Sequence, residues 1–251
     1  MTGIIDDIKE IYNRPNNGLV KIIMINIAIF LLINIVVLFC KLFGFPSIAD
    51  LFYKMSFTMP ADLTKLIFRP WTVITYFFAQ RDLFHILSNM LFLYWFGRII
   101  ESLIGNSKVI SIYILGGLMG AAFYFLCYYT IPFFIQNRSL ANVLGASGSV
   151  CAIVVAAATL SPNYEIRLLL LGEVKIKWIA WIYVVMSIIG MGGSNAGGNA
   201  VHIGGSLLGF LFIRQLQKGD DWSRFVMPFL TRMGNLFAKK EIRVTHRSTT
   251  A

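Results

Sequence analysis

Residues 83–100 read LFHILSNMLFLYWFGRII, an apolar run with His85 and Asn89 near its start. A run of about 18 or more mainly apolar residues is long enough to cross the roughly 30 Å hydrocarbon layer of a bilayer as a helix. Because a histidine is costly to keep inside that layer, its presence there points to a function. Residues at i and i+4 share one helix face, so both polar side chains should point the same way.

Five further apolar runs accompany this one, and the composition agrees with them. The 251-residue chain is 57% hydrophobic and 14% charged, with a mean hydropathy of +0.71, which does not fit a water-soluble domain. We therefore predict an all-α polytopic membrane protein. Its six expected spans cover residues 22–43, 83–100, 109–134, 143–160, 178–191 and 200–216, with a long outer loop between the first two.

The charge distribution predicts the orientation and the division of the chain. The net charge is +10, and most of the 22 Lys and Arg residues fall on the side of the N-terminus, so both termini are expected in the cytoplasm. Three parts follow: an interfacial N-terminal segment 1–20, a six-helix domain 21–217 and a basic tail 218–251. The tail suits either an amphipathic surface segment or a solvated chain, and Pro228 and Gly234 should interrupt a long helix there.

The charged residues also predict the membrane in which the protein lies and the kinds of partner it binds. Asp6, Asp7 and Glu10 argue against a mitochondrial targeting peptide, and we expect the inner membrane of a bacterium. The basic residues are spread over several short loops instead of one face, so a nucleic-acid partner is not expected. The expected surroundings are the lipid bilayer.

Two other spans carry unusual residues at the same end as the second. The fourth contains Gly145-Ala-Ser147-Gly148, and His202 opens the last. Spans two, four and six all run from the outer to the inner face, so His85, Ser147 and His202 should lie at one depth near the outer face. A serine hydroxyl becomes a nucleophile when a base accepts its proton, and imidazole is the usual base near neutral pH. Since the spans contain no partner carboxylate, the sequence allows a dyad of Ser147 and His202.

The residues around this dyad suit the same chemistry. The unpaired N–H groups of a helix start can face an oxyanion, and His85 and Asn89 supply two further donors. Small residues favour close approach of the two spans: Gly148 on the fourth and the GxxxG pair Gly205 and Gly209 on the last. A hydrogen bond of about 3 Å between the two side chains needs such contact.

Each feature alone has a plainer interpretation. An isolated GxSG is usually helix packing, a buried histidine is often only a polar contact, and His85 with Asn89 can hold two helices together. Other functions fit less well. A transporter or channel would place ionisable groups near the midplane, and metal-dependent or aspartyl proteases would need HExxH or paired aspartates, which the spans lack. No metal or cofactor is expected.

Taken together, these motifs resemble the rhomboid family of intramembrane serine proteases. The family's GxSG matches residues 145–148, its HxxxN matches 85–89, and its final histidine with following glycines matches 202–209. The resemblance covers about residues 67 to 216. The chain departs from the family at Thr72, Gln80 and Cys151, where an arginine, an extra histidine and an aromatic ring are common.

The resemblance implies an intramembrane serine endopeptidase that cleaves transmembrane protein substrates near the outer face. Ser147 would be the nucleophile and His202 the general base and acid, and the oxyanion would be bound by His85, Asn89 and the Ser147 N–H. The outer loop and the fifth span are expected to move to admit substrate. The alternative is a non-catalytic rhomboid-like protein that binds membrane client helices.

Overall fold

The computed structural model describes residues 17–168 and 172–237, and within them it is mostly helical. Four of the described helices are long and apolar enough to cross a membrane: α2 (Gly18–Leu42), α6 (Leu83–Ile104), α7 (Asn106–Thr130) and α11 (Ala196–Gln217). Two shorter apolar helices, α9 (Ser147–Leu160) and α10 (Ile176–Ile189), lie where the fourth and fifth spans were expected. The prediction of an all-α polytopic fold is confirmed.

Local signals set where the second and third spans begin. The carboxylate of Asp82 accepts a hydrogen bond from the His85 N–H at 2.8 Å, which caps α6 and places His85 in its first turn. At the other end Gly105 has a φ of +89°, a conformation that glycine adopts freely, and the chain turns there directly into α7.

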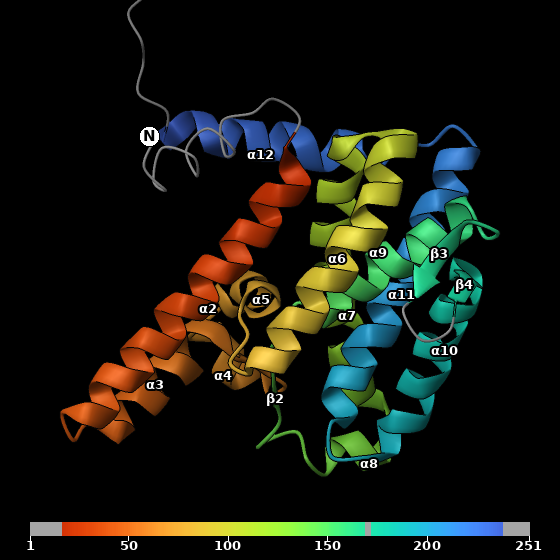
Figure 1. Ribbon diagram of the computed structural model, residues 1–251. Coiled ribbons are helices and arrows are strands. Elements are labelled where there is room, and N and C mark those ends of the chain that lie inside the picture. Colours follow the sequence, from red (N-terminus) through yellow and green to blue (C-terminus); the bar gives the residue numbers. More distant parts are fainter. Residues whose placement is uncertain (1–16, 169–171, 238–251) are drawn as a thin grey trace, which may run out of the picture.

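The short helix α9 forms the centre of the bundle. It packs against α6, α7, α10 and α11, and 11 of its 14 residues are buried. In Figure 1, α6, α7 and α11 surround it, α10 lies at one edge and α2 leans away on the opposite side. Gly, Ala and Ser make up much of α9, and such small side chains let neighbouring helices approach closely inside a bilayer.

The outer loop between α2 and α6 has structure of its own. It contains α3 (Pro46–Phe57), β1 (Met59–Pro60), α4 (Leu63–Ile67), α5 (Thr72–Thr75) and the 3₁₀ turn η1 (Tyr76–Phe78). After α7 the chain passes through α8 (Pro132–Ile135) to β2 (Asn142–Val143), which pairs antiparallel with β1. The loop is therefore joined to the segment that leads into α9.

A buried arginine anchors this loop although position 72 is a threonine. The Arg69 guanidinium donates to the Lys54 carbonyl at 2.6 Å and to the Asn142 side chain at 3.2 Å. The Thr72 hydroxyl donates to the Arg69 carbonyl at 2.7 Å. Trp71 adds a hydrogen bond from its indole to the Met55 carbonyl at 3.0 Å. Hydrogen bonds of a charged donor are the stronger kind, so Arg69 is the main tie between α3 and β2.

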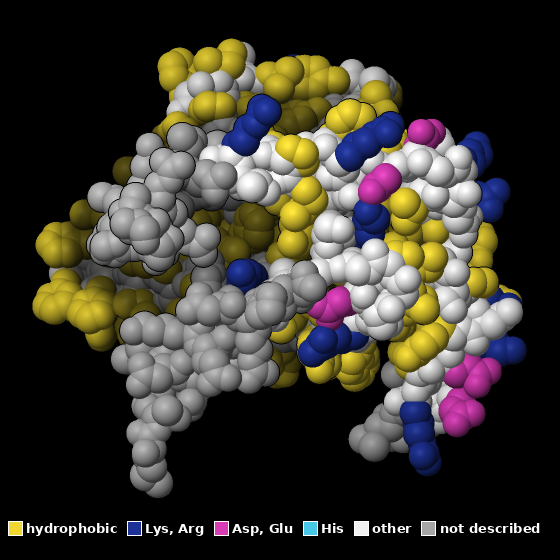
Figure 2. All heavy atoms as spheres, turned by 90° about the horizontal axis from the view of Figure 1, so that it is seen from above, with side chains coloured by type: hydrophobic (Ala, Val, Ile, Leu, Met, Phe, Trp, Pro, Cys, Tyr) yellow, Lys and Arg dark blue, Asp and Glu magenta, His cyan; other side chains and the backbone are white. Residues whose placement is uncertain are grey.

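The face of the bundle where α6 ends and α7 begins carries many of the basic residues. Between α9 and α10 it presents a hairpin of β3 (Glu165–Leu168) and β4 (Gly172–Lys175). The helix α12 (Ser223–Phe237) lies across the same face, roughly perpendicular to the spans (Figure 1). Figure 2 views this face and shows Lys and Arg side chains scattered over it. We refer to it below as the basic face.

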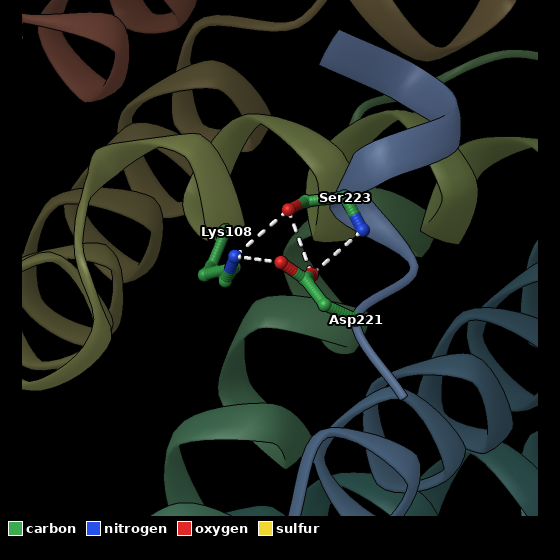
Figure 3. A network of polar contacts seen from close by, with 3 residues as sticks. All are labelled: Lys108, Asp221 and Ser223. Atoms are coloured by element: carbon green, nitrogen blue, oxygen red, sulfur yellow. Dashed lines mark hydrogen bonds and ion pairs between the residues drawn. The ribbon is translucent and has the colours of Figure 1, made fainter. Parts of the chain in front are cut away.

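The interruption expected at Pro228 is absent, and α12 continues through it and through Gly234. Proline removes one helical hydrogen bond, but a helix on the surface leaves the freed carbonyl open to water. Where α12 begins, the Lys108 ammonium on α7 binds the Asp221 carboxylate and the Ser223 hydroxyl (Figure 3). The predicted N-terminal segment up to residue 16, and the tail beyond residue 237, lie outside the described residues.

Candidate active site

A glycine in an unusual conformation leads the chain into the candidate nucleophile. Gly145 has a φ of +135°, which L side chains rarely adopt. A Cβ there would lie 3.1 Å from Cε1 of His85 and 3.4 Å from Oγ of Ser147, so both side chains lie close to this glycine. The Gly145 N–H donates to the Tyr76 carbonyl at 2.9 Å, which ties the entry of α9 to the outer loop.

Ser147 and His202, 55 residues apart in sequence, are in hydrogen-bond contact. Ser147 is the first residue of α9, and His202 lies in the second turn of α11. Nε2 of His202 is 2.7 Å from Oγ of Ser147. Ser147 is buried, with 7% of its surface exposed, and His202 is half-buried. This geometry allows the imidazole to accept a proton from the hydroxyl.

The backbones of α9 and α11 touch along a seam of small residues beside this pair. A Cβ on Gly205 would overlap the carbonyl oxygen of Gly148, and a Cβ on Gly209 would overlap that of Ala152. These atoms belong to the backbone and cannot move aside as a flexible side chain would. The close approach that brings His202 to Ser147 therefore depends on glycine at both positions of α11.

Donors for a developing negative charge lie on two elements. The N–H groups in the first turn of α9 have no partner within that helix, as at every helix start. His85, which lies beside Gly145, and Asn89, which is buried, both come from the first two turns of α6. The amide of Asn89 donates one hydrogen to Oε1 of Gln80 at 2.7 Å and has a second N–H to offer.

Gln80 belongs to a buried polar chain that sequence reasoning did not predict. Its amide lies 3.4 Å from Oδ1 of Asn26 on α2, and Asn26 donates to the Tyr113 hydroxyl on α7 at 2.9 Å. Tyr113 in turn donates to the Phe77 carbonyl at 2.8 Å. Asn26 and Gln80 are fully buried. An asparagine inside the first apolar run was the available signal, since buried polar groups need partners.

Two residues of α10 that sequence reasoning also missed contact His202. The Tyr183 ring lies beside the His202 ring, with centroids 5.7 Å apart and planes at 57°. Oγ of Ser187 lies 3.3 Å from Nδ1 of His202. The aromatic neighbour absent at Cys151 is thus supplied from the fifth span. The spacing of Tyr183 and Ser187, i and i+4 on one helix face, could have indicated them.

The described residues form no candidate metal site. Within residues 17–168 and 172–237, no group of three His, Cys, Asp or Glu side chains could hold a metal ion. The described site contains a hydroxyl, an imidazole and N–H donors, which are the groups that an acyl-transfer reaction would use.

Comparisons with known proteins match this arrangement to one family. The rhomboid domain matches residues 68–218. RHOMBOID-like protein 12, mitochondrial, of Arabidopsis thaliana is 31% identical over 59% of this chain and 47% of its own length. Presenilin-associated rhomboid-like protein A, mitochondrial, of Danio rerio is 27% identical over 72% of this chain and 45% of its own length. Rhomboid protein 1, mitochondrial, of Saccharomyces cerevisiae is 24% identical over 84% of this chain and 56% of its own length. The chain spans about half the length of these relatives.

The names of the relatives correct the prediction of location. The expected bacterial inner membrane, with both termini in the cytoplasm, is contradicted, because these relatives are mitochondrial by name. Asp6, Asp7 and Glu10 bear only on one kind of targeting peptide, and the distribution of Lys and Arg gives only the orientation in a membrane. Neither identifies the membrane. A multi-pass membrane protein is supported by the four long apolar helices. With the domain match covering more than half of its residues, the chain belongs to the rhomboid family.

Proposed function

We propose that this protein is an intramembrane serine endopeptidase that hydrolyses peptide bonds in or near transmembrane segments. The observation that carries the proposal is the 2.7 Å contact between Nε2 of His202 and Oγ of Ser147. A hydroxyl and an imidazole in this relation form the smallest unit of serine-protease chemistry. The names of the relatives favour a mitochondrial membrane as its location.

The reaction proceeds through an acyl-enzyme. Oγ of Ser147 attacks the substrate carbonyl carbon while Nε2 of His202 takes the hydroxyl proton. The C–N bond then breaks, and His202 returns the proton to the leaving amine. A water molecule attacks the ester that remains on Ser147, with His202 again as base, and releases the carboxylic acid and the free serine.

The negative charge of the tetrahedral intermediates is stabilised from α9 and α6. The Ser147 N–H, the His85 ring and the second N–H of Asn89 are the proposed donors. Asn89 is held by Gln80, so its amide needs little reorganisation as the charge develops. Preorganised donors of this kind usually account for about a hundredfold or more of the rate.

Substrate is proposed to enter beside α10. Only Ile176, Ala180 and Ser187 are buried along this helix, while Trp181, Ile182 and Met186 are exposed. It packs on α9 and α11, and its contact with α6 is slight, although the Phe92 and Tyr183 rings meet at 6.2 Å. A helix held on one side only can move at the other, which suits the admission of a transmembrane segment.

The proposal is tested by cleavage of a single-span substrate with a destabilised helix, using purified protein in detergent. Ser147→Ala and His202→Ala are each expected to abolish cleavage while leaving the thermal unfolding of the protein intact. Ser111→Ala, at a buried serine of α7 with no described hydrogen-bond partner, is the matched control and should cleave normally. Full activity of either dyad variant would contradict the proposal, whereas a folded wild type that binds the segment without cleaving it would favour a client-binding protein.

A further inference from the structure

The two ring nitrogens of His202 have different partners. Nε2 lies 2.7 Å from Oγ of Ser147, and Nδ1 lies 3.3 Å from Oγ of Ser187 on α10. A neutral imidazole carries one hydrogen, on one nitrogen or the other. Only the form with the hydrogen on Nδ1 leaves a lone pair on Nε2 to accept the proton of Ser147. The tautomer of His202 therefore decides whether it is a base toward Ser147.

The hydroxyl of Ser187 favours that form because its single hydrogen is already used. It donates to the Tyr183 carbonyl, one turn earlier in α10, at 2.9 Å. The hydroxyl oxygen keeps its lone pairs, so toward His202 it acts as an acceptor. An acceptor beside Nδ1 stabilises the hydrogen on that nitrogen, as the group behind the histidine does in other hydrolases.

The surroundings make this contact effective. Ser187 is 4% exposed, so bulk water does not compete strongly for Nδ1. The Tyr183 ring lies 5.7 Å from the His202 ring and restricts its rotation. The described helices α9, α10 and α11 contain no Asp or Glu, so none of them brings a carboxylate to this role.

We propose that Ser187 is a positioning residue that holds His202 in its Nδ1–H tautomer. This inference rests on the proposed function of His202 as the base. It also joins the base to α10, the helix proposed to move for substrate entry. A displacement of α10 would take Ser187 away from Nδ1, so the base is oriented only while α10 is in place.

The direct test is nitrogen-15 NMR of histidine-labelled protein in detergent at a pH where the rings are neutral. The chain has three histidines, and His246→Gln leaves only His85 and His202 to assign. His202 is expected to show a protonated Nδ1 and an unprotonated Nε2. Ser187→Ala should remove this preference and give a mixture of both forms. An unchanged tautomer in Ser187→Ala would overturn the inference.

Kinetics provide the second test. Ser187→Ala is expected to lower kcat about tenfold with little change in KM, since one neutral hydrogen bond and the fraction of the active tautomer are lost. Ser187→Thr keeps a hydroxyl and should recover most of kcat and the wild-type tautomer. Ser111→Ala, the control substitution used above, should change neither kcat nor the tautomer of His202. A Ser187→Thr variant that folds and shows the wild-type tautomer, yet is as slow as Ser187→Ala, would contradict a role through the hydroxyl.

These outcomes separate the inference from the proposed function. The tautomer of His202 is measured without any substrate, so it is informative even if the protein cleaves nothing. If Ser147→Ala retains full activity, the dyad is wrong, while the NMR result still reports on Ser187. If the dyad holds and Ser187→Ala alters neither tautomer nor kcat, only the role of Ser187 fails.

Discussion

The helices α9 and α10 have the same length of 14 residues and very different surroundings. In α9, 11 residues are buried, and in α10 only three. Small side chains in α9 allow α7 and α11 to pack closely on it, whereas α10 presents Trp181, Ile182 and Met186 outward. The proposed nucleophile thus stands on a fixed helix and the proposed support of the base on a loosely held one. We infer that the proposed nucleophile is held in place by close packing, whereas the helix proposed to admit substrate also carries the proposed support of the base.

The packing of α11 on α9 should be lost when one of their close backbone contacts is blocked. Gly209→Val would force a side chain into the Ala152 backbone, whose carbonyl carbon lies 2.9 Å from the position of an added Cβ. We expect a loss of about 3 kcal/mol or more in the free energy of unfolding, and loss of activity. Thermal unfolding in detergent measures it. Gly192→Ala, where no atom lies within 4 Å, is the control and should behave as wild type.

Substitution of one isoleucine in each helix compares how tightly α9 and α10 are packed. Ile153 of α9 is fully buried, and Ile182 of α10 is 64% exposed. Ile153→Ala leaves a cavity and should lower the free energy of unfolding by about 2 to 4 kcal/mol. Ile182→Ala should change it by less than about 0.5 kcal/mol. Similar losses from both, measured by unfolding in the same detergent, would mean that α10 is as tightly packed as α9.

Substitution of Gln80 tests whether the proposed oxyanion donor Asn89 is held in place by the packed core. Gln80→Leu removes the acceptor of Asn89 and leaves buried polar groups of Asn26 and Asn89 without that partner. We expect about 1 to 3 kcal/mol of destabilisation, and a loss of kcat of about tenfold with KM nearly unchanged. Unchanged kcat in a folded Gln80→Leu protein would show that Asn89 does not need this support.

The smallest effect concerns the attachment of α12 to α7 on the basic face. Burial raises the pKa of Asp221, but hydrogen bonds from Lys108 and Ser223 outweigh it and hold the pKa below the ordinary carboxyl value. A lowered pKa gives stability that is complete above the ordinary value and is lost as the pH falls through the lowered one. For a partly exposed pair the contribution is under about 1 kcal/mol.

Hydrogen exchange of the α12 amides measures this attachment. Exchange, corrected for its intrinsic pH dependence, should increase as the pH falls below about 4. Lys108→Ala should give the faster exchange already at pH 7 and lose this pH dependence, while Lys218→Ala, which removes the same charge from the basic face, should not. Equal exchange in Lys108→Ala and wild type at pH 7 would contradict the attachment.

The features that could be predicted from the sequence are those that depend on the residue pattern within a single helix. The six apolar runs, the seam of Gly205 and Gly209 and the pairing of His85 with Asn89 follow from period and length. Contacts between side chains of different helices and loops could not be predicted in this way. The contacts of Ser187 with Nδ1 of His202 and of Gln80 with Asn89 depend on how α10 and the outer loop fold back. The sequence marks some of these residues as candidates, through helical spacing or a polar residue in an apolar run, but it does not identify their partners. Pro228 was misjudged because its cost depends on whether the freed carbonyl is solvated.

The central claim is that His202 activates Ser147, and covalent labelling tests it most directly. A fluorophosphonate probe reacts with an activated serine hydroxyl and leaves a mass on one peptide. We expect labelling of Ser147 in the wild type and no labelling of Ser147→Ala or His202→Ala, although both variants remain folded. Equal labelling of His202→Ala and wild type, or attachment of the probe to a different serine, would contradict the account.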